Sequence, residues 1–332
     1  MTRPERTTLP PTAAPPTARR RRPVPTLLGP LVALALLLVF NALFTPNFLT
    51  VQTLNVNLTQ VATTVIVAVG MTLVIATGGI DLSVGALMAI SGAVAPMLFL
   101  HPPFGNAALG VGLAFVVPVL VAGLFGLFNG ALVTRFGIQP FIATLILFIA
   151  GRGIAQVMTN GQLQTFSNAA FGYIGLGRPL GIPFQVILMV LIVALFAWVM
   201  RRTVFGRHVL AVGGNEAAAR LAGIPTNRVK LAVYGISGLL AGVAGLIVIA
   251  INSSSDANQV GLNMELDAIA AVAVGGTALT GGRATIVGTL LGALIIQLIR
   301  YTLLARGVPD AAALVVKAAI ILVAVYIQRQ RR

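Results

Sequence analysis

A series of long apolar segments is the feature that most constrains the fold of this chain. Ten such segments occur in 332 residues, at about 27–45, 54–77, 82–100, 107–133, 140–158, 183–200, 229–251, 265–280, 284–304 and 311–327. Most of them reach the roughly 20 residues that a helix needs to cross a bilayer. Lipid cannot hydrogen-bond the backbone, so such segments must form helices. The sequence therefore predicts an all-α polytopic membrane protein with about ten transmembrane helices, some of them short or broken.

The composition supports a membrane protein and excludes several function classes. Hydrophobic residues make up 58% of the chain and charged residues 9%, whereas a soluble domain carries about 25% charged residues. The 22 Lys and Arg, against seven Asp and Glu, lie mainly near segment ends. That placement follows the positive-inside rule rather than phosphate binding, so we expect no nucleic-acid partner. The chain has no Cys and two distant His, His101 and His208, so we expect no metal and no cofactor.

The distribution of basic residues also predicts the topology. We expect a disordered, Pro- and Arg-rich cytoplasmic tail at 1–25, a transmembrane domain at 26–328, and a cytoplasmic tail at 329–332. The longest cytoplasmic connection is the basic loop 201–230, and the main outer loops are 159–182 and 252–264. The segments 140–158 and 265–280 are short, which predicts tilted, broken or re-entrant elements. The sequence does not place Arg152, Arg300 and Lys317, and snorkelling to an interface is the default expectation.

One apolar stretch is interrupted by a polar, glycine-containing sequence, Gly78-Gly79-Ile80-Asp81-Leu82-Ser83-Val84-Gly85. Gly and Asp are both unfavourable inside a membrane helix, so a helix break is predicted here. The break is either a water-exposed turn or a place where polar groups line a solute path. Ala273-Val274-Gly275-Gly276 echoes Ala76-Thr77-Gly78-Gly79, as in the repeated broken helices of transporters. We therefore predict breaks or gates at Gly78, Gly79, Gly275 and Gly276.

Polar and aromatic residues inside other segments are candidates for the path. Asn129 and Thr144 are neutral hydrogen-bonding residues, which either join helices or contact a hydroxylated solute. Phe141 either packs or offers an aromatic face to a sugar ring. Residues 276–283 have the glycine spacing of a phosphate loop but lack its lysine, and no catalytic constellation is present. We therefore expect that the chain is not an enzyme.

The loop 201–230 contains a predicted short helix. Asn215 is a suitable N-cap, Glu216 suits the first turn, and the alanine-rich run that follows ends at Gly223. Such a helix either docks into a groove on a soluble partner or is a solvated amphipathic connector.

Four motifs, in order along the chain, carry a family resemblance. They lie at 70–85, at 139–145 with 151–153, at 205–224, and at 265–282. As a set they resemble permease subunits of ribose-type carbohydrate-uptake ABC importers, from about residue 50 to 328. Within that family, 138–141 and 150–156 are most similar to galactofuranose importer permeases.

The resemblance implies a multi-pass subunit of the bacterial inner membrane that translocates a monosaccharide such as galactofuranose or ribose. It implies a second permease (identical or homologous), two cytosolic ABC ATPase subunits or one fused double ATPase, and a periplasmic or lipid-anchored sugar-binding protein. The chain itself would contact membrane lipid. ATP would be hydrolysed by the partner subunits. The implied coupling residues are Gly213, Gly214, Asn215, Glu216, Ala217, Ala219 and Gly223. The expected translocation path holds Asp81, Ser83, Asn129, Phe141 and Thr144. The alternative is a proton- or ion-coupled secondary transporter that uses Asp81.

Overall fold

The computed structural model describes residues 27–309, 311–312, 314–316, 318–319 and 322. The predicted tails at 1–25 and 329–332, and Lys317, lie outside the described residues, as does much of the tenth apolar segment. No orientation or packing is assigned to these parts.

The described chain is helical, with one small pair of strands. Six helices are long and apolar enough to cross a membrane: α2 (Val51–Ala76), α4 (Ala107–Thr134), α5 (Pro140–Met158), α7 (Phe184–Arg202), α10 (Thr226–Asn252) and α12 (Ile286–Ala305). The shorter apolar helices are α1 (Leu28–Phe44) and α3 (Val84–Leu100). The remaining helices are α6 (Ala169–Leu176), α8 (Val204–Gly214), α9 (Glu216–Leu221) and α11 (Met264–Val274). The strands β1 (Gln164–Thr165) and β2 (Ser254–Ser255) pair antiparallel. The predicted class, an all-helical polytopic membrane protein, is confirmed.

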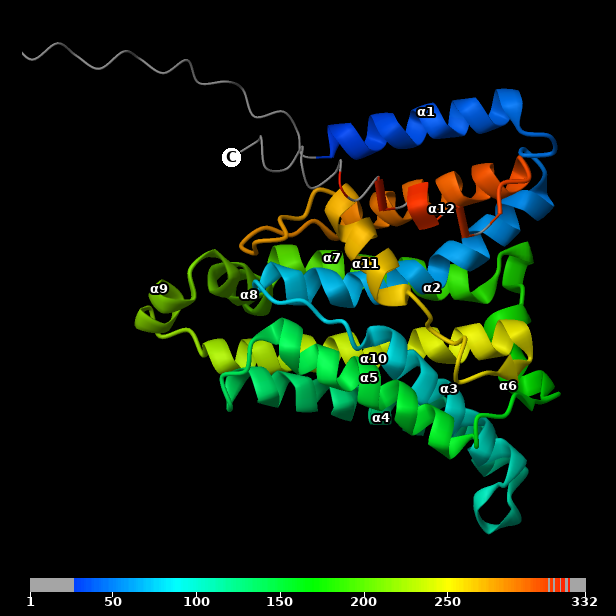
Figure 1. The fold of residues 1–332 in the computed structure, drawn as a ribbon, viewed down its shortest axis with the longest axis horizontal. Coiled ribbons are helices and arrows are strands. Elements are labelled where there is room, and N and C mark those ends of the chain that lie inside the picture. Colours follow the sequence, from blue (N-terminus) through cyan, green and yellow to red (C-terminus); the bar gives the residue numbers. More distant parts are fainter. Residues whose placement is uncertain (1–26, 310, 313, 317, 320–321, 323–332) are drawn as a thin grey trace, which may run out of the picture.

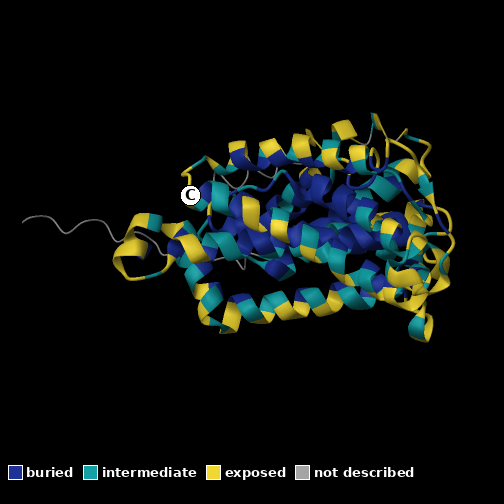
Figure 2. Cartoon of the chain, turned by 90° about the horizontal axis from the view of Figure 1, so that it is seen from below, coloured by how far each residue is buried: buried dark blue, intermediate teal, exposed yellow. Residues whose placement is uncertain are grey.

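The long helices run side by side, with α2 and α10 at the centre of the bundle (Figure 1). Buried residues concentrate in the middle of the molecule, and its outer faces and ends are exposed (Figure 2). Glycines bring α4 and α10 close: a Cβ at Gly126 would overlap the carbonyl oxygen of Tyr234, and one at Gly238 would overlap that of Ala122. Small residues therefore let these backbones touch, as the glycine spacing of membrane helices predicts.

The two short apolar segments differ from one another in the structure. The prediction for 140–158 was a tilted, broken or re-entrant element, and α5 is an uninterrupted helix of 19 residues, so this segment is not broken. The segment 265–280 is interrupted as predicted, because α11 has only 11 residues and ends before Gly275. At about 1.5 Å per residue, α11 is about 16 Å long, roughly half the hydrocarbon thickness.

The helix ends after α2 and α11 have the same geometry. Gly78 has φ 83° and Gly276 has φ 85°, conformations that favour glycine. After α2, Gly79 N donates to Val74 O and Gly78 N to Ile75 O. After α11, Thr277 N donates to Val272 O and Gly276 N to Ala273 O, which completes the same Schellman motif. Gly78 therefore corresponds to Gly276, one position away from the alignment that the sequence echo suggests.

Candidate functional site

Asp81, in the break between α2 and α3, is the centre of a buried hydrogen-bond network. Its Oδ1 accepts from Ser83 N at 3.0 Å and from Ser83 Oγ at 2.6 Å. Its Oδ2 accepts from Ser237 Oγ of α10 at 2.8 Å. Asn129 Nδ2 of α4 donates to Ser83 Oγ at 2.8 Å. The carboxylate thus holds the turn that starts α3 and ties it to α4 and α10.

The main-chain carbonyl of Ile80 extends the network to a further helix. Tyr234 Oη of α10 donates to it at 3.3 Å, and Thr144 Oγ1 of α5 lies 3.4 Å from it. Ser237 and Tyr234 were not among the residues singled out from the sequence. Serine and tyrosine in an apolar helix carry no local signal that identifies their partners, and Ser237 is 156 residues from Asp81.

The structure brings together four of the five residues expected in the translocation path. Asp81, Ser83, Asn129 and Thr144 are fully buried, whereas Phe141 is 48% exposed and contacts the network through its main-chain carbonyl, 3.4 Å from Thr144 Oγ1. Among the described residues, Asn129 Oδ1 has no hydrogen-bond partner. In this conformation the four polar side chains form a packed plug between helices rather than the wall of an open channel.

The segment 201–230 makes direct backbone contact with the break after α2. At Gly213, near the end of α8, a Cβ would overlap the carbonyl oxygen of Ala76, and Gly282 N lies 2.6 Å from the same Cβ position. Gly282 N also donates to Ala76 O at 3.0 Å. A Cβ at Gly281 would lie 2.9 Å from both Gly213 O and Gly78 N. We call this contact of Ala76, Gly78, Gly213, Gly281 and Gly282 the glycine junction.

The short helix predicted within 201–230 is present as α9, and its caps are those expected. Asn215 Oδ1 accepts from Ala218 N at 3.0 Å. Gly223 has φ 80°, and Ile224 N donates to Ala219 O. Glu216 forms salt bridges with Arg220 and Lys230, which ties α9 to the start of α10. The helices α8 and α9 project from the end of the bundle, at the left of Figure 1, and Leu221 is 90% exposed there.

Arg152 of α5 contacts backbone rather than an interface, which corrects the expectation that it snorkels. Its Nη1 donates to Ala257 O at 2.8 Å and to Val260 O at 2.6 Å. Gln156, one turn later, donates to Asn258 Oδ1 at 2.7 Å. The three acceptor residues belong to 253–263, the segment between α10 and α11, which we call the α10–α11 connector. The outer loop 252–264 therefore lies partly inside the bundle rather than wholly at the surface.

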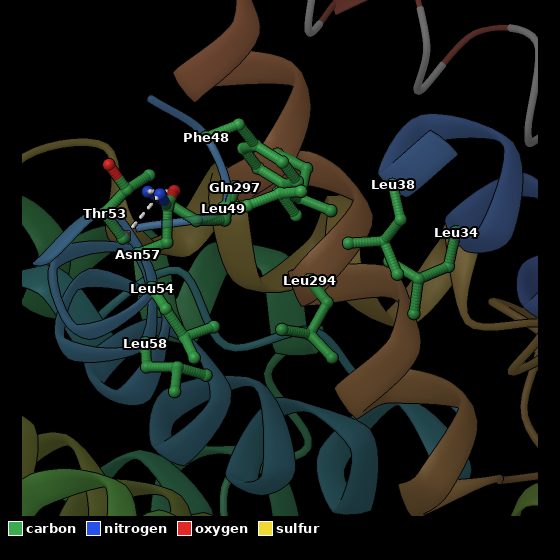
Figure 3. Close-up of a pocket in the computed structure, with 11 residues that line it drawn as sticks. Leu34, Leu38, Phe48, Leu49, Thr53, Leu54, Asn57, Leu58, Leu294 and Gln297 are labelled. Carbon is green, nitrogen blue, oxygen red and sulfur yellow. Dashed lines mark hydrogen bonds between the residues drawn. The ribbon is translucent and has the colours of Figure 1, made fainter. Parts of the chain in front are cut away.

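One cavity of about 280 Å³ lies between α1, α2 and α12. Leu34 and Leu38 of α1 face Leu294 of α12 across it, and Asn57 and Gln297 meet at one end (Figure 3). Leucines supply most of its lining. The cavity lacks the residues of the Asp81 network and has few polar groups for a hydroxylated solute.

These features define a polytopic membrane permease with broken helices and a short capped helix, α9, that projects from one end of the bundle. Residues 54–325 match the family described as "Branched-chain amino acid transport system / permease component". The chain belongs to this family of transport permeases, and the resemblance to ribose-type ABC importer permeases is confirmed.

Several relatives are similar over nearly the whole chain. The galactofuranose transporter permease protein YtfT of Escherichia coli is 43% identical over 95% of this chain and 93% of its own. The ribose import permease protein RbsC of Escherichia coli is 43% identical over 91% and 93%. The L-arabinose ABC transporter permease protein AraH of Azospirillum brasilense is 36% identical over 99% and 96%. No solved structure matches the chain.

Membership of this family decides between two earlier alternatives. The chain is a multi-pass membrane permease of an ABC importer, whose ATP is hydrolysed by a separate subunit. The secondary-transporter alternative is set aside. In agreement, both carboxylate oxygens of Asp81 accept hydrogen bonds from serines that fix the start of α3.

Proposed function

We propose that this chain is the membrane subunit through which an ABC importer passes a monosaccharide of the ribose, galactofuranose or arabinose class. The observation that carries the proposal is the near full-length similarity to permeases of these three sugars. The buried polar residues support it, because Asn129, Thr144 and Ser237 are neutral hydrogen-bonding groups suited to hydroxyls.

In this proposal α9 docks on a cytosolic ATPase and the glycine junction transmits its movement. The helix is short, capped at both ends and exposed at Leu221, as a docking element requires. Gly213 lies in the last turn of α8, two residues before the N-cap of α9, and touches the end of α2 and the loop before α12. A displacement of α9 would therefore reach both helix breaks through backbone contacts that contain no flexible side chain.

The solute path is proposed to run past the Asp81 network. Asp81, Ser83, Asn129 and Thr144 join α3, α4, α5 and α10, so relative movement of these helices would open the plug. Phe141 would line the path only after such a movement. Gly78, Gly79, Gly275 and Gly276 are the proposed hinge positions, because they end α2 and α11 next to this region.

The full assembly and topology complete the proposal. We infer ten membrane elements with both termini cytoplasmic; nine of the ten predicted segments are helices in the described part of the chain. The permease would pair with a second copy or a homologue, with two ABC ATPase domains and with an external sugar-binding protein. The exposed parts of α6 and of the adjoining outer loops are the proposed contact with that protein.

Reconstitution tests the function directly. Vesicles that contain this chain with its cognate ATPase and binding protein should hydrolyse ATP faster when a monosaccharide is added, and should accumulate that sugar. The chain without the ATPase should accumulate none. Sugar uptake by the chain alone on a proton gradient, or a fully assembled complex inert to every monosaccharide of these classes, would contradict the proposal.

A further inference from the structure

The α10–α11 connector descends from the outer end of α10 into the bundle along α3. Near its start, Ser255 Oγ lies 3.5 Å from the position of a Cβ at Gly92. Further on, Gly261 packs backbone to backbone against Gly85. Gly92 and Gly85 are about 10 Å apart along a helix. The connector therefore reaches the inner end of α3, well below the outer surface.

Because Gly261 of the connector packs on Gly85 at the start of α3, α11 begins inside the helix bundle. The helix runs inward from Met264, whereas α3 runs outward from Val84, and their N-termini meet at Gly85. Figure 1 shows α11 near the middle of the bundle, with the connector reaching it from the right. Helix N-termini carry unpaired N–H groups and partial positive charge. Such meeting points of broken helices favour polar solutes.

Glu265, in the first turn of α11, has an unused acceptor at this meeting point. The residue is 5% exposed, and among the described residues its Oε2 has no hydrogen-bond partner. This oxygen packs against Gly85, where a Cβ would lie 2.6 Å from it. A buried carboxylate oxygen without a donor is unfavourable. A second state that supplies a donor would therefore be favoured at this position.

Arg152 has its acceptors only while the connector is in place. The two carbonyls that it binds, at Ala257 and Val260, both belong to the connector. The guanidinium also attracts Glu265 and Asp256 electrostatically. A guanidinium has five N–H donors and no acceptor. If the connector withdraws, Arg152 needs oxygen acceptors and Glu265 Oε2 becomes accessible.

We propose that Arg152 and Glu265 are a solute-contacting pair, occluded here by the α10–α11 connector. This rests on the proposed function and names residues of its path that lie outside the Asp81 network. The carbonyl oxygens of Ala257 and Val260 occupy the positions that hydroxyl oxygens of the sugar take on Arg152. A further hydroxyl donates to Glu265 Oε2. A neutral polyhydroxylated solute accepts hydrogen bonds from Arg152 and donates one to Glu265, whereas a simple ion cannot do both.

Uptake of a sugar and of its monodeoxy analogues by the reconstituted complex tests the pair. Wild type should prefer the parent sugar to at least one analogue by about tenfold, the effect of one hydrogen bond to a charged group. Glu265→Gln should reduce that preference to near equality. The matched control is Asp267→Asn, which removes the same charge from the same helical turn and should keep the wild-type preference.

The outcomes separate this inference from the proposed function. If wild type takes up no monosaccharide, the proposed function fails. If wild type transports but Glu265→Gln slows the sugar and every analogue equally, or Asp267→Asn acts in the same way, the inference is wrong. Should Glu265→Gln not assemble, Arg152→Lys is measured on the same analogues, with the same expected loss of preference.

Immobilising the connector gives an independent test. The chain has no native Cys, so Gln156→Cys with Asn258→Cys can be joined by a short bis-methanethiosulfonate reagent. The cross-link should abolish uptake and a reductant should restore it, whereas each single-Cys variant should transport normally with the reagent. Full uptake by the cross-linked protein would show that transport does not require withdrawal of the connector, and would overturn the inference.

Discussion

The Cα of Gly213 packs directly on the main-chain carbonyl of Ala76, so the last turn of α8 touches the end of the central helix α2. The same carbonyl accepts a hydrogen bond from Gly282 N at 3.0 Å. Three segments far apart in sequence therefore meet at one backbone oxygen. The arrangement leaves no room for a side chain at position 213. This close packing, rather than a positive φ angle, is the reason for a glycine there.

Gly213→Ala should uncouple the complex. The added methyl group would displace α8 from α2, so sugar-stimulated ATP hydrolysis should fall about tenfold or more, since well-packed backbone contacts cannot absorb it. The measurement is ATPase activity with and without loaded binding protein in reconstituted vesicles.

The neighbouring glycine is the control for this substitution. A Cβ at Gly214 meets nothing within 4 Å, so Gly214→Ala should retain wild-type stimulation. Equal effects of the two alanines would show that the glycine junction transmits nothing.

Asp81→Ala should destabilise the folded permease. It removes the acceptor of Ser83 N, Ser83 Oγ and Ser237 Oγ, and leaves buried donors unpaired at a cost of about 1–3 kcal/mol for each such group. The expected result is a clearly lower midpoint of thermal unfolding in detergent. Ser237→Ala removes one bond and should lower the midpoint less, by the equivalent of about 1 kcal/mol.

Comparison with Asp81→Asn separates charge from hydrogen bonding at this position. The amide keeps the volume and one acceptor, so its midpoint should fall between those of wild type and Asp81→Ala. An unaltered midpoint and unaltered uptake in Asp81→Ala would remove the network from both folding and transport.

Gly78→Ala and Gly276→Ala should be destabilising to a similar degree, because both residues have the same left-handed cap conformation. A non-glycine residue in that conformation costs about 1–2 kcal/mol. Thermal unfolding in detergent measures both effects. Gly112→Ala, in open space on α4, is the control and should leave the midpoint unchanged or raise it. A large difference between Gly78→Ala and Gly276→Ala would contradict the equivalence of the two caps.

Leu221→Asp should weaken binding of the ATPase without affecting the fold of the permease. Leu221 is 90% exposed at the tip of α9, so the free permease loses no packing. Co-purification with the tagged ATPase should fall about tenfold or more, while the unfolding midpoint of the isolated permease stays constant. An exposed leucine in the loop between α6 and α7, Leu180, which is 97% exposed, supplies the matched Leu180→Asp control, to be judged by ATPase co-purification. Undiminished co-purification of Leu221→Asp would place the docking surface elsewhere.

Structural features that depend on a few neighbouring residues were predictable from the sequence. The helical ends of α9 were predictable because Asn215 and Gly223 act on backbone groups within a few residues. The break at Gly78 was predictable for the same reason. The residue equivalent to Gly78 at the end of α11 was not predictable. The sequence similarity aligns Gly78 with Gly275, whereas the hydrogen bonds of the two helix caps align it with Gly276.

Partners distant in sequence were outside the reach of such arguments. Nothing near Ser237 indicates that its hydroxyl meets Asp81, and nothing near Arg152 indicates that it binds the connector carbonyls. Both contacts depend on how α3, α5 and α10 pack, which no periodicity encodes. The family motifs indicated the class of protein but did not indicate which polar residues meet.

The sequence alone determined that this chain spans a membrane, breaks its helices at glycines and has a short capped helix at 216–221, because composition and backbone preference act locally. Only the tertiary structure decided that Gly213 rests on Ala76, that Asp81 is fully satisfied and that Glu265 is not. Those outcomes depend on the close approach of several helices, and a hydrogen bond exists only where that packing brings donor and acceptor within about 3 Å.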